Sequence, residues 1–311
     1  MTRLLTIERV CLIGHVMSMI FGLAGLLWVL PHPSVLTALP EQGLTLFQWS
    51  LSGGGVVYMV LAAITVSLFA YRTLGTYRWL SFMLPAVFLS LGSELLGTST
   101  GFPFGHYHYL SGLGYKIAGL VPFTIPLSWF YLGFSTYVLA GAALTRLSYR
   151  WGQGKAAIPP LLRVLATIVL GMMLLTAWDL VLDPAMSQAP FKFWEFQEAG
   201  AFFGMPYRNL SGWMATGAIY MSVASLFWKQ DPIFLSRQQL ILPLVLYGVN
   251  FGFGAVITIV QLDHIFLFPV LLGVIFGLVP AFLLWWLTGT NENPVHPAPL
   301  DTTLKSPAAV S

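Results

Sequence analysis

Residues 92–115 read GSELLGTSTGFPFGHYHYLSGLGY and continue an apolar run that begins at Leu80. The segment carries one carboxylate, Glu94, followed by two histidines, three tyrosines and a cluster of hydroxyl side chains. An ionisable side chain inside a membrane span costs about 2.5–3.5 kcal/mol on insertion scales, and such residues usually serve a function. If this run crosses a membrane, Glu94 is the first candidate for a functional site.

The composition of the whole chain predicts a membrane protein. Its 311 residues are 57% hydrophobic and 8% charged, with a mean hydropathy of +0.79. About a quarter of the residues of a soluble domain are charged. Apolar runs of about 20 residues, the length that crosses a hydrocarbon core, recur along the chain. We predict an all-α, polytopic bundle of about eight transmembrane helices at 11–30, 50–70, 80–97, 122–145, 161–182, 210–228, 240–260 and 265–288.

These spans predict one integral membrane domain over residues 1–290. A tail at 291–311, rich in Pro, Ala and Thr, is expected to be disordered. Arg3 and Arg9 precede the first span and no small-residue cleavage site follows it, which indicates an uncleaved anchor. The single cysteine, Cys11, excludes an internal disulfide and a cysteine-rich metal site.

The basic residues predict the orientation of the bundle. With the N-terminus inside, 11 of the 14 Lys and Arg residues fall in cytoplasmic segments, and Lys116, Lys192 and Arg208 fall outside. Cytoplasmic loops are enriched in Lys and Arg, so we expect a multi-pass chain with both termini in the cytoplasm. The net charge of +3 then reports topology and does not indicate nucleic-acid binding.

On this topology, polar side chains collect at the outer ends of the spans. The outer loops at 98–121 and 183–209 are rich in aromatic residues, Gly and Pro. Backbone at membrane depth must be shielded from lipid, so we expect these loops to form an ordered lid or a re-entrant floor over an intramembrane cavity. The candidate site residues are Glu94, His106, Tyr107, His108, Asp179, Asp183, Tyr207, Arg208, Asn209, Asn250 and His264.

Several candidates also have a purely structural interpretation. Glu94 and Asp179 could be buried, hydrogen-bonded struts. Arg208 could pair with Asp179 or Asp183 and hold two helices together. Aromatic residues are enriched at membrane interfaces, and four rings could be anchors there: Tyr107, Tyr109, Trp194 and Trp213.

The residues discriminate between several membrane chemistries. Di-iron hydroxylases and desaturases need about eight clustered histidines, whereas this chain has six, of which only His106 and His108 are paired. Intramembrane prenyltransferases need two aspartate-rich sets for magnesium diphosphate, and Asp179 with Asp183 forms a single set. No glycine-rich strand-to-helix turn of a flavin or nicotinamide enzyme is present. A transporter stays possible, since polar residues at depth also line substrate paths.

Three blocks carry a resemblance to a known family: ELLGTSTGFPFGHYHYLSGLGYKIAGLVPFTIPLSWF (94–130), AWDLVLDPAMS (177–187) and FFGMPYRNLSGWMATG (202–217). They resemble the signature blocks of the CruF-type carotenoid hydratases, bacterial and archaeal membrane proteins of the wider carotenoid-biosynthesis family. The resemblance implies that the chain lies in the bacterial inner (plasma) membrane. The resemblance implies addition of water across the 1,2 (1′,2′) double bond of an acyclic ψ end group, as in γ-carotene or lycopene, to give a tertiary 1-hydroxy carotenoid. It does not reveal which carboxylate has which role.

The chemistry of this reaction fits the candidate residues. Hydration begins with protonation at C2, and water then captures the tertiary cation at C1. Desolvation favours the neutral form of a carboxyl group, so we expect Glu94 or Asp179 to donate the proton. Aromatic rings at Tyr107, Trp178 and Tyr207 would hold the cation. His106, His108 and His264 would relay protons to the outer side. We expect no cofactor and no metal. The expected partners are a carotenoid that enters laterally from the lipid, water, the bilayer and other carotenoid-pathway enzymes.

Overall fold

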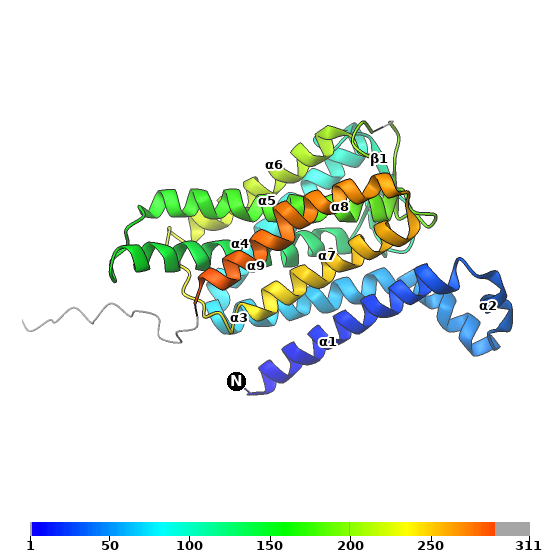
Figure 1. The fold of residues 1–311 in the computed structure, drawn as a ribbon, viewed down its shortest axis with the longest axis horizontal. Coiled ribbons are helices and arrows are strands. Elements are labelled where there is room, and N and C mark those ends of the chain that lie inside the picture. Colours follow the sequence, from blue (N-terminus) through cyan, green and yellow to red (C-terminus); the bar gives the residue numbers. More distant parts are fainter. Residues whose placement is uncertain (1, 199, 290–311) are drawn as a thin grey trace, which may run out of the picture.

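A computed structural model of the chain describes residues 2–198 and 200–289, which form a bundle of long helices (Figure 1). Seven helices in this part of the chain are long and apolar enough to cross a membrane. Large apolar side chains such as Val10, Ile13 and Met17 are exposed on the outside of the bundle, where lipid would cover them. The protein is therefore an all-α, polytopic membrane protein, as the composition predicts.

In chain order, the helices and strands are α1 (Thr2–Ala24), η1 (Gly25–Val29), α2 (Pro33–Ala38), α3 (Glu41–Thr100), β1 (Tyr107–Tyr109), β2 (Lys116–Ile117), β3 (Val121–Pro122), α4 (Thr124–Trp151), α5 (Pro160–Ser187), β4 (Trp194–Phe196), α6 (Tyr207–Phe227), α7 (Ile241–Gln261), η2 (His264–Phe266), α8 (Leu267–Gly273), η3 (Val274–Leu278) and α9 (Val279–Leu287).

Helix α3 contains two of the predicted spans, 50–70 and 80–97. Its 48-residue apolar stretch is more than twice the length that one crossing needs. Gly75 has φ 83° and ψ 168°, a backbone conformation that glycine adopts readily and other residues rarely do. This conformation interrupts the helix. Gly55 and Gly97, one on each arm, both lie against segment 104–113. Helix α3 is thus a helical hairpin whose arms account for two crossings, which reconciles the seven long helices with the eight predicted spans.

Helix α4 forms the centre of the bundle. It packs against α3, α5, α7 and α9, and its residues from Thr124 to Ala143 are buried except for the half-buried Leu127. Ser, Thr, Gly and Ala are frequent along this helix. Small residues let neighbouring membrane helices approach closely. The central helix therefore holds the surrounding helices in fixed positions around the site described below.

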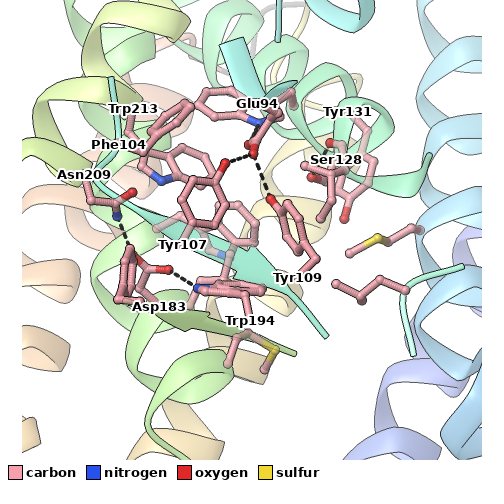
Figure 2. A pocket seen from close by; sticks show the side chains of 18 of the residues that line it. Glu94, Phe104, Tyr107, Tyr109, Ser128, Tyr131, Asp183, Trp194, Asn209 and Trp213 are labelled. Atoms are coloured by element: carbon pink, nitrogen blue, oxygen red, sulfur yellow. Dashed lines mark hydrogen bonds between the residues drawn. The ribbon is translucent and has the colours of Figure 1, made fainter. Parts of the chain in front are cut away.

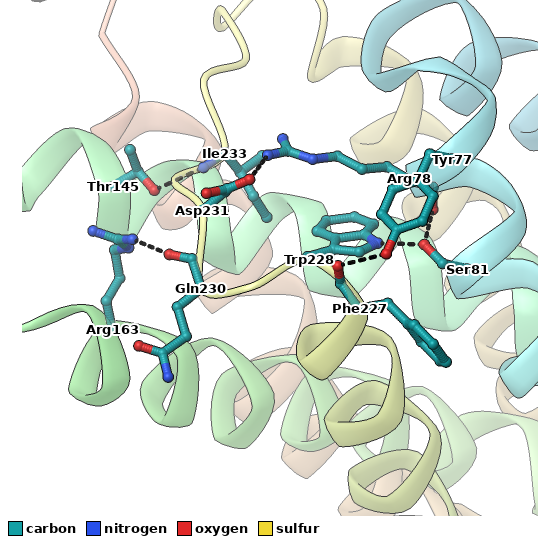
Figure 3. Close-up of polar contacts among 10 residues, drawn as sticks. All are labelled: Tyr77, Arg78, Ser81, Thr145, Arg163, Phe227, Trp228, Gln230, Asp231 and Ile233. Carbon is teal, nitrogen blue, oxygen red and sulfur yellow. Dashed lines mark hydrogen bonds and ion pairs between the residues drawn. The ribbon is translucent and has the colours of Figure 1, made fainter.

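The Gly75 end of the bundle is fastened by polar contacts to the loop between α6 and α7 (Figure 3). Arg78 forms an ion pair of 3.0 Å with Asp231, and Arg163 donates to the Gln230 carbonyl oxygen at 2.7 Å. Trp228 Nε1 donates to Ser81 Oγ at 3.0 Å. The structure thus gathers basic residues at the end opposite to Glu94, while the side of the membrane on which this end lies stays a prediction. The predicted disordered tail, 291–311, lies outside the described residues.

Candidate active site

Two short antiparallel strands form a lid over the end of the bundle opposite to Gly75. In the β1–β4 pair, Tyr107 lies opposite Phe196 and Tyr109 lies opposite Trp194. Side chains alternate between the two faces of a strand. The four rings therefore point into the bundle, whereas His108 points outward and is exposed. The two loops that were expected to form an ordered lid or a re-entrant floor contribute one strand each to this pair, so the structure shows the first of these alternatives.

Two glycines allow the lid to approach the helices closely. A Cβ atom on Gly97 would lie 2.7 Å from Phe104 Cδ2 and 3.2 Å from the Tyr107 hydroxyl oxygen. A Cβ atom on Gly212 of α6 would lie 2.5 Å from Phe104 Cδ1. Phe104 is thus wedged between α3 and α6. Gly97 follows Glu94 by three residues and shares its helix face, so the missing side chain lets the lid reach that carboxylate.

Glu94 is buried beneath the lid and accepts hydrogen bonds from three side chains (Figure 2). Its Oε2 accepts from the hydroxyl groups of Tyr107 and Tyr109, the latter at 2.9 Å, and its Oε1 accepts from Trp129 Nε1 at 2.9 Å. Burial, together with the nearby Glu94 carboxylate, raises the pKa of both tyrosines well above the ordinary value. The two hydroxyl groups therefore stay protonated and remain donors.

A second acidic group lies on α5. Asp179 and Asp183 are one turn apart on the same helix face, and Asn209 Nδ2 donates to Oδ2 of both, at 3.0 Å to Asp179. Trp194 Nε1 donates to Asp183 Oδ1 at 2.9 Å. Asp179 Oδ1 is buried with no hydrogen-bond partner among the described residues. The predicted span ended at 182, which implied that Asp183 begins a loop. That boundary is wrong, because helix α5 continues to Ser187 and Asp183 is helical.

Glu94 and Asp183 line the same small cavity, which is walled by aromatic rings (Figure 2). Its volume of about 50 Å³ can hold water, since roughly 10–15 Å³ is enough for one molecule. Trp129 stacks on Trp213 with ring centroids 4.0 Å apart, and Trp178 meets Trp213 edge-on at 5.7 Å. The cavity therefore combines two carboxyl groups with several π faces.

The carboxyl groups of the site have no basic partner in the described part of the chain. The side chains that line the cavity include no Lys, Arg or His, and the three ion pairs of residues 2–198 and 200–289 involve Glu8, Asp231 and Glu195 instead. Within the same residues, no group of three or more His, Cys, Asp or Glu side chains could hold a metal ion. Buried carboxyl groups without a counter-charge depend on hydrogen bonds or on a bound proton.

The structure brings together five of the predicted site residues. Glu94, Tyr107, Asp183 and Asn209 line the cavity, and Asp179 lies behind Asp183 without reaching the wall. Glu94 or Asp179 had been expected to donate the proton, and of the two aspartates Asp179 had been given the larger role because it lies deeper in the apolar span. Instead, Asp183, one turn closer to the lid, contacts the cavity.

Five other predicted residues do not reach the cavity. His106, His108, Tyr207, Arg208 and His264 are exposed at the lid end of the bundle. Tyr207 and Arg208 are the first two residues of α6, and their side chains are exposed. The third residue, Asn209, faces α5. The suggested ion pair between Arg208 and the α5 aspartates is therefore absent from the described residues. Proton relay by the histidines stays a prediction.

Asn250 belongs to a separate buried cluster. Its Nδ2 contacts His15 Nε2 at 3.1 Å, and Tyr131 donates to its Oδ1 at 3.4 Å. His15 Nδ1 lies 2.8 Å from the Tyr58 carbonyl oxygen, which can only accept, so this nitrogen carries the proton and Nε2 accepts from Asn250. Tyr58 and Tyr131 line the site cavity. Asn250 therefore supports the cavity wall from behind.

Four aromatic residues at the site were not among the predicted site residues. Trp129 lies in a long apolar segment, where a tryptophan gives no sign of a polar contact, yet it donates to Glu94. Tyr109, Trp194 and Trp213 could have been interface anchors, but all three line the cavity. For Tyr109 the Tyr107-x-Tyr109 spacing was the available signal, because it places two rings on one strand face.

The fold and the site define a polytopic membrane protein with an enclosed acidic cavity under an aromatic lid. Residues 54–280, more than half of the chain, match the family of carotenoid biosynthesis proteins, and the chain belongs to that family.

A curated relative supports the resemblance to the CruF-type hydratases. Over 130 residues the chain is 33% identical to the bisanhydrobacterioruberin hydratase of Haloarcula japonica. The matched region covers 42% of this chain and 39% of that protein, so it spans well under half of the relative's length. A comparison with solved structures found no match.

Proposed function

We propose that the protein is a carotenoid hydratase that adds water across the 1,2 double bond of an acyclic ψ end group, without a redox cofactor or metal. One observation carries the proposal: Glu94 and Asp183 face a single aromatic-walled cavity whose described lining has no basic side chain. Membership of the carotenoid biosynthesis family and the similarity to a hydratase support the substrate class and the reaction.

The aspartate pair is the proposed proton donor. Two buried carboxylates bound to the same Asn209 amide repel each other when both are charged, and a proton held by the pair removes that repulsion. Asp183 is the member on the cavity wall, so it delivers the proton to C2 of the substrate. Asp179 lies behind it and shares the charge that remains.

Glu94 is the proposed carboxylate that stabilises the cation and activates water. Its three donors favour the ionised form of an acceptor, and the faces of Trp129 and Trp213 can attract a cation. Water attacks C1 as Glu94 accepts one of its protons, which gives the tertiary alcohol. In each reaction the aspartate pair loses one proton and Glu94 gains one. Transfer of a proton from Glu94 to the aspartate pair through cavity water restores both groups.

Water can reach the site from the lid. Phe196 lines both the site cavity and a surface cavity of about 330 Å³ whose walls include Ser187, Gln188 and Glu198. The polar surface cavity and the acidic site therefore adjoin at Phe196. This arrangement supports a reaction in which water comes from the lid side while the apolar substrate stays in the membrane.

Expression in bacteria that accumulate lycopene or γ-carotene tests the proposed function. We expect products heavier by one water per reacted ψ end, and the same products in anaerobic cells, with oxygen-18 incorporated from labelled water. A gain of an isoprenoid unit would indicate prenyl transfer, and unchanged pigment would indicate binding or transport. A requirement for dioxygen would contradict hydration and indicate a hydroxylase.

A further inference from the structure

A second, larger cavity opens on the flank of the bundle between α1 with η1 and the first arm of α3. Its volume is about 560 Å³, within the range of roughly 300–1,000 Å³ that is typical of small-molecule sites. We call it the flank groove. Tyr58 and Met186 line both the flank groove and the acidic cavity. The two cavities therefore meet at these two side chains.

Glycines keep the flank groove open on both helices. Gly25 at the start of η1 and Gly53 of α3 line it, and a Cβ atom on either would meet no atom within 4 Å. By contrast, a Cβ atom on Gly273 would lie 3.0 Å from Phe251 and 3.1 Å from the Ala177 carbonyl oxygen. Gly273 thus serves helix packing, whereas Gly25 and Gly53 do not. At these two positions the absence of a side chain leaves open space that is part of the groove.

The backbone beside the flank groove is irregular. Segment Gly25–Val29 is π-helical, a feature that is rare and frequent at functional sites. Aromatic side chains line the groove where it approaches the acidic cavity, among them Phe191, Phe193 and Phe253. Flat rings of this kind can stack against a planar conjugated chain, which a flexible acyl chain cannot match.

The size of the acidic cavity adds a further argument. A volume of about 50 Å³ can admit only the reacting end of a long substrate, so the remainder must lie elsewhere. We propose that the flank groove binds the conjugated polyene chain of the carotenoid, while its ψ end passes between Tyr58 and Met186 into the acidic cavity. The identity of the reacting end rests on the proposed hydratase function, whereas the binding of a polyene by the groove can be measured without catalysis.

Blocking the flank groove tests this proposal. Gly25→Leu and Gly53→Leu place a branched side chain in the open space, and Gly248→Leu is the matched control. Gly248 is a helical glycine of α7 whose Cβ would also meet no atom within 4 Å, and it does not line the groove. Each protein is purified in detergent from lycopene-accumulating cells, and the carotenoid bound per protein is measured by absorbance. Thermal unfolding of each purified variant shows that the bundle is intact.

We expect the wild type and Gly248→Leu to retain carotenoid, and the two groove variants to retain at least about tenfold less, as expected from overpacking a close-fitting site. Equal retention by all variants, or retention of lipid alone by the wild type, would overturn the proposal. If the wild type binds carotenoid in a groove-dependent way but yields no hydrated product, the polyene site stands and the hydratase function fails. A short isoprenoid with the same end group should still react in the groove variants.

Discussion

Replacing Glu94 by glutamine removes the charge of the site carboxylate and keeps its shape. Glutamine offers one carbonyl oxygen and one amide NH₂ group. Trp129 Nε1 can only donate, so the carbonyl oxygen must face it. The NH₂ group then faces the hydroxyl groups of Tyr107 and Tyr109, which can rotate to accept. The three contacts of Glu94 can therefore persist in the variant.

The expected effects on folding and on catalysis differ in size. Hydrogen bonds to a charged group contribute about 1.5–3 kcal/mol and neutral ones about 0.5–1.5 kcal/mol, so each contact of Glu94 weakens by about 1 kcal/mol. The lower cost of burying a neutral group offsets part of that loss. By contrast, the loss of a positioned acid or base lowers a rate by about 10²–10⁴-fold. Glu94→Leu would instead leave three buried donors unpaired, at about 1–3 kcal/mol each, and would confound the test.

The assay compares hydrated product with the amount of protein in the membrane. For Glu94→Gln we expect at least about a 100-fold loss of product at a membrane level close to wild type. Glu8→Gln is the control, because Glu8 is also buried but pairs with Arg72 at 2.9 Å near the opposite end of the bundle. Near-normal hydration by Glu94→Gln would refute a catalytic role. Loss of the protein from the membrane would show that the carboxylate is a structural strut.

Three further predictions concern the aspartate pair, the lid and the orientation. Asp183→Asn should reduce hydration more than Asp179→Asn because Asp183 lines the cavity, and EDTA should leave product yields unchanged; an EDTA-sensitive reaction would favour prenyl transfer. Burial raises the folded-state pKa of Tyr107, so its contribution to stability is complete below about pH 10 and declines as the pH rises further; thermal unfolding in detergent should show this decline, and less of it in Tyr107→Phe. In a Cys11→Ser background, His106→Cys should react in intact cells with an impermeant thiol reagent, and labelling only after lysis would invert the predicted topology.

The sequence was sufficient to predict a polytopic helical bundle and the approximate positions of its long helices, because apolar runs of membrane length are a strong signal. It did not predict that Gly75 alone reverses the chain within a continuous helical segment. A single glycine with a positive φ cannot be distinguished in the sequence from a glycine that packs against a neighbour. The end of α5 was also misjudged, because Pro184 lies inside the last turn of the helix and does not terminate it.

The candidate site was predicted at the level of its carboxylates, since charged residues in apolar segments stand out. Their partners were harder to find. Whether Tyr207 or Asn209 faces α5 depends on the rotation of α6, which the sequence leaves open because both lie in its first turn. Trp129 reaches Glu94 from α4, and contacts between distant segments of this kind depend on the packing of the whole bundle. Exposed His106 and His108 were selected for their chemistry alone.

The negative charge of the acidic cavity has no counter-charge among the described residues, and the proposed reaction supplies one. Glu94 is surrounded by neutral donors, and the Asp179–Asp183 pair is bound to a neutral amide. A structural strut is usually matched by a counter-charge, as Glu8 is by Arg72. In the proposed hydration, the positive charge is supplied by the substrate once C2 is protonated. The fixed negative groups and aromatic faces would then bind the cationic intermediate more strongly than the neutral carotenoid, which is the condition for lowering the barrier.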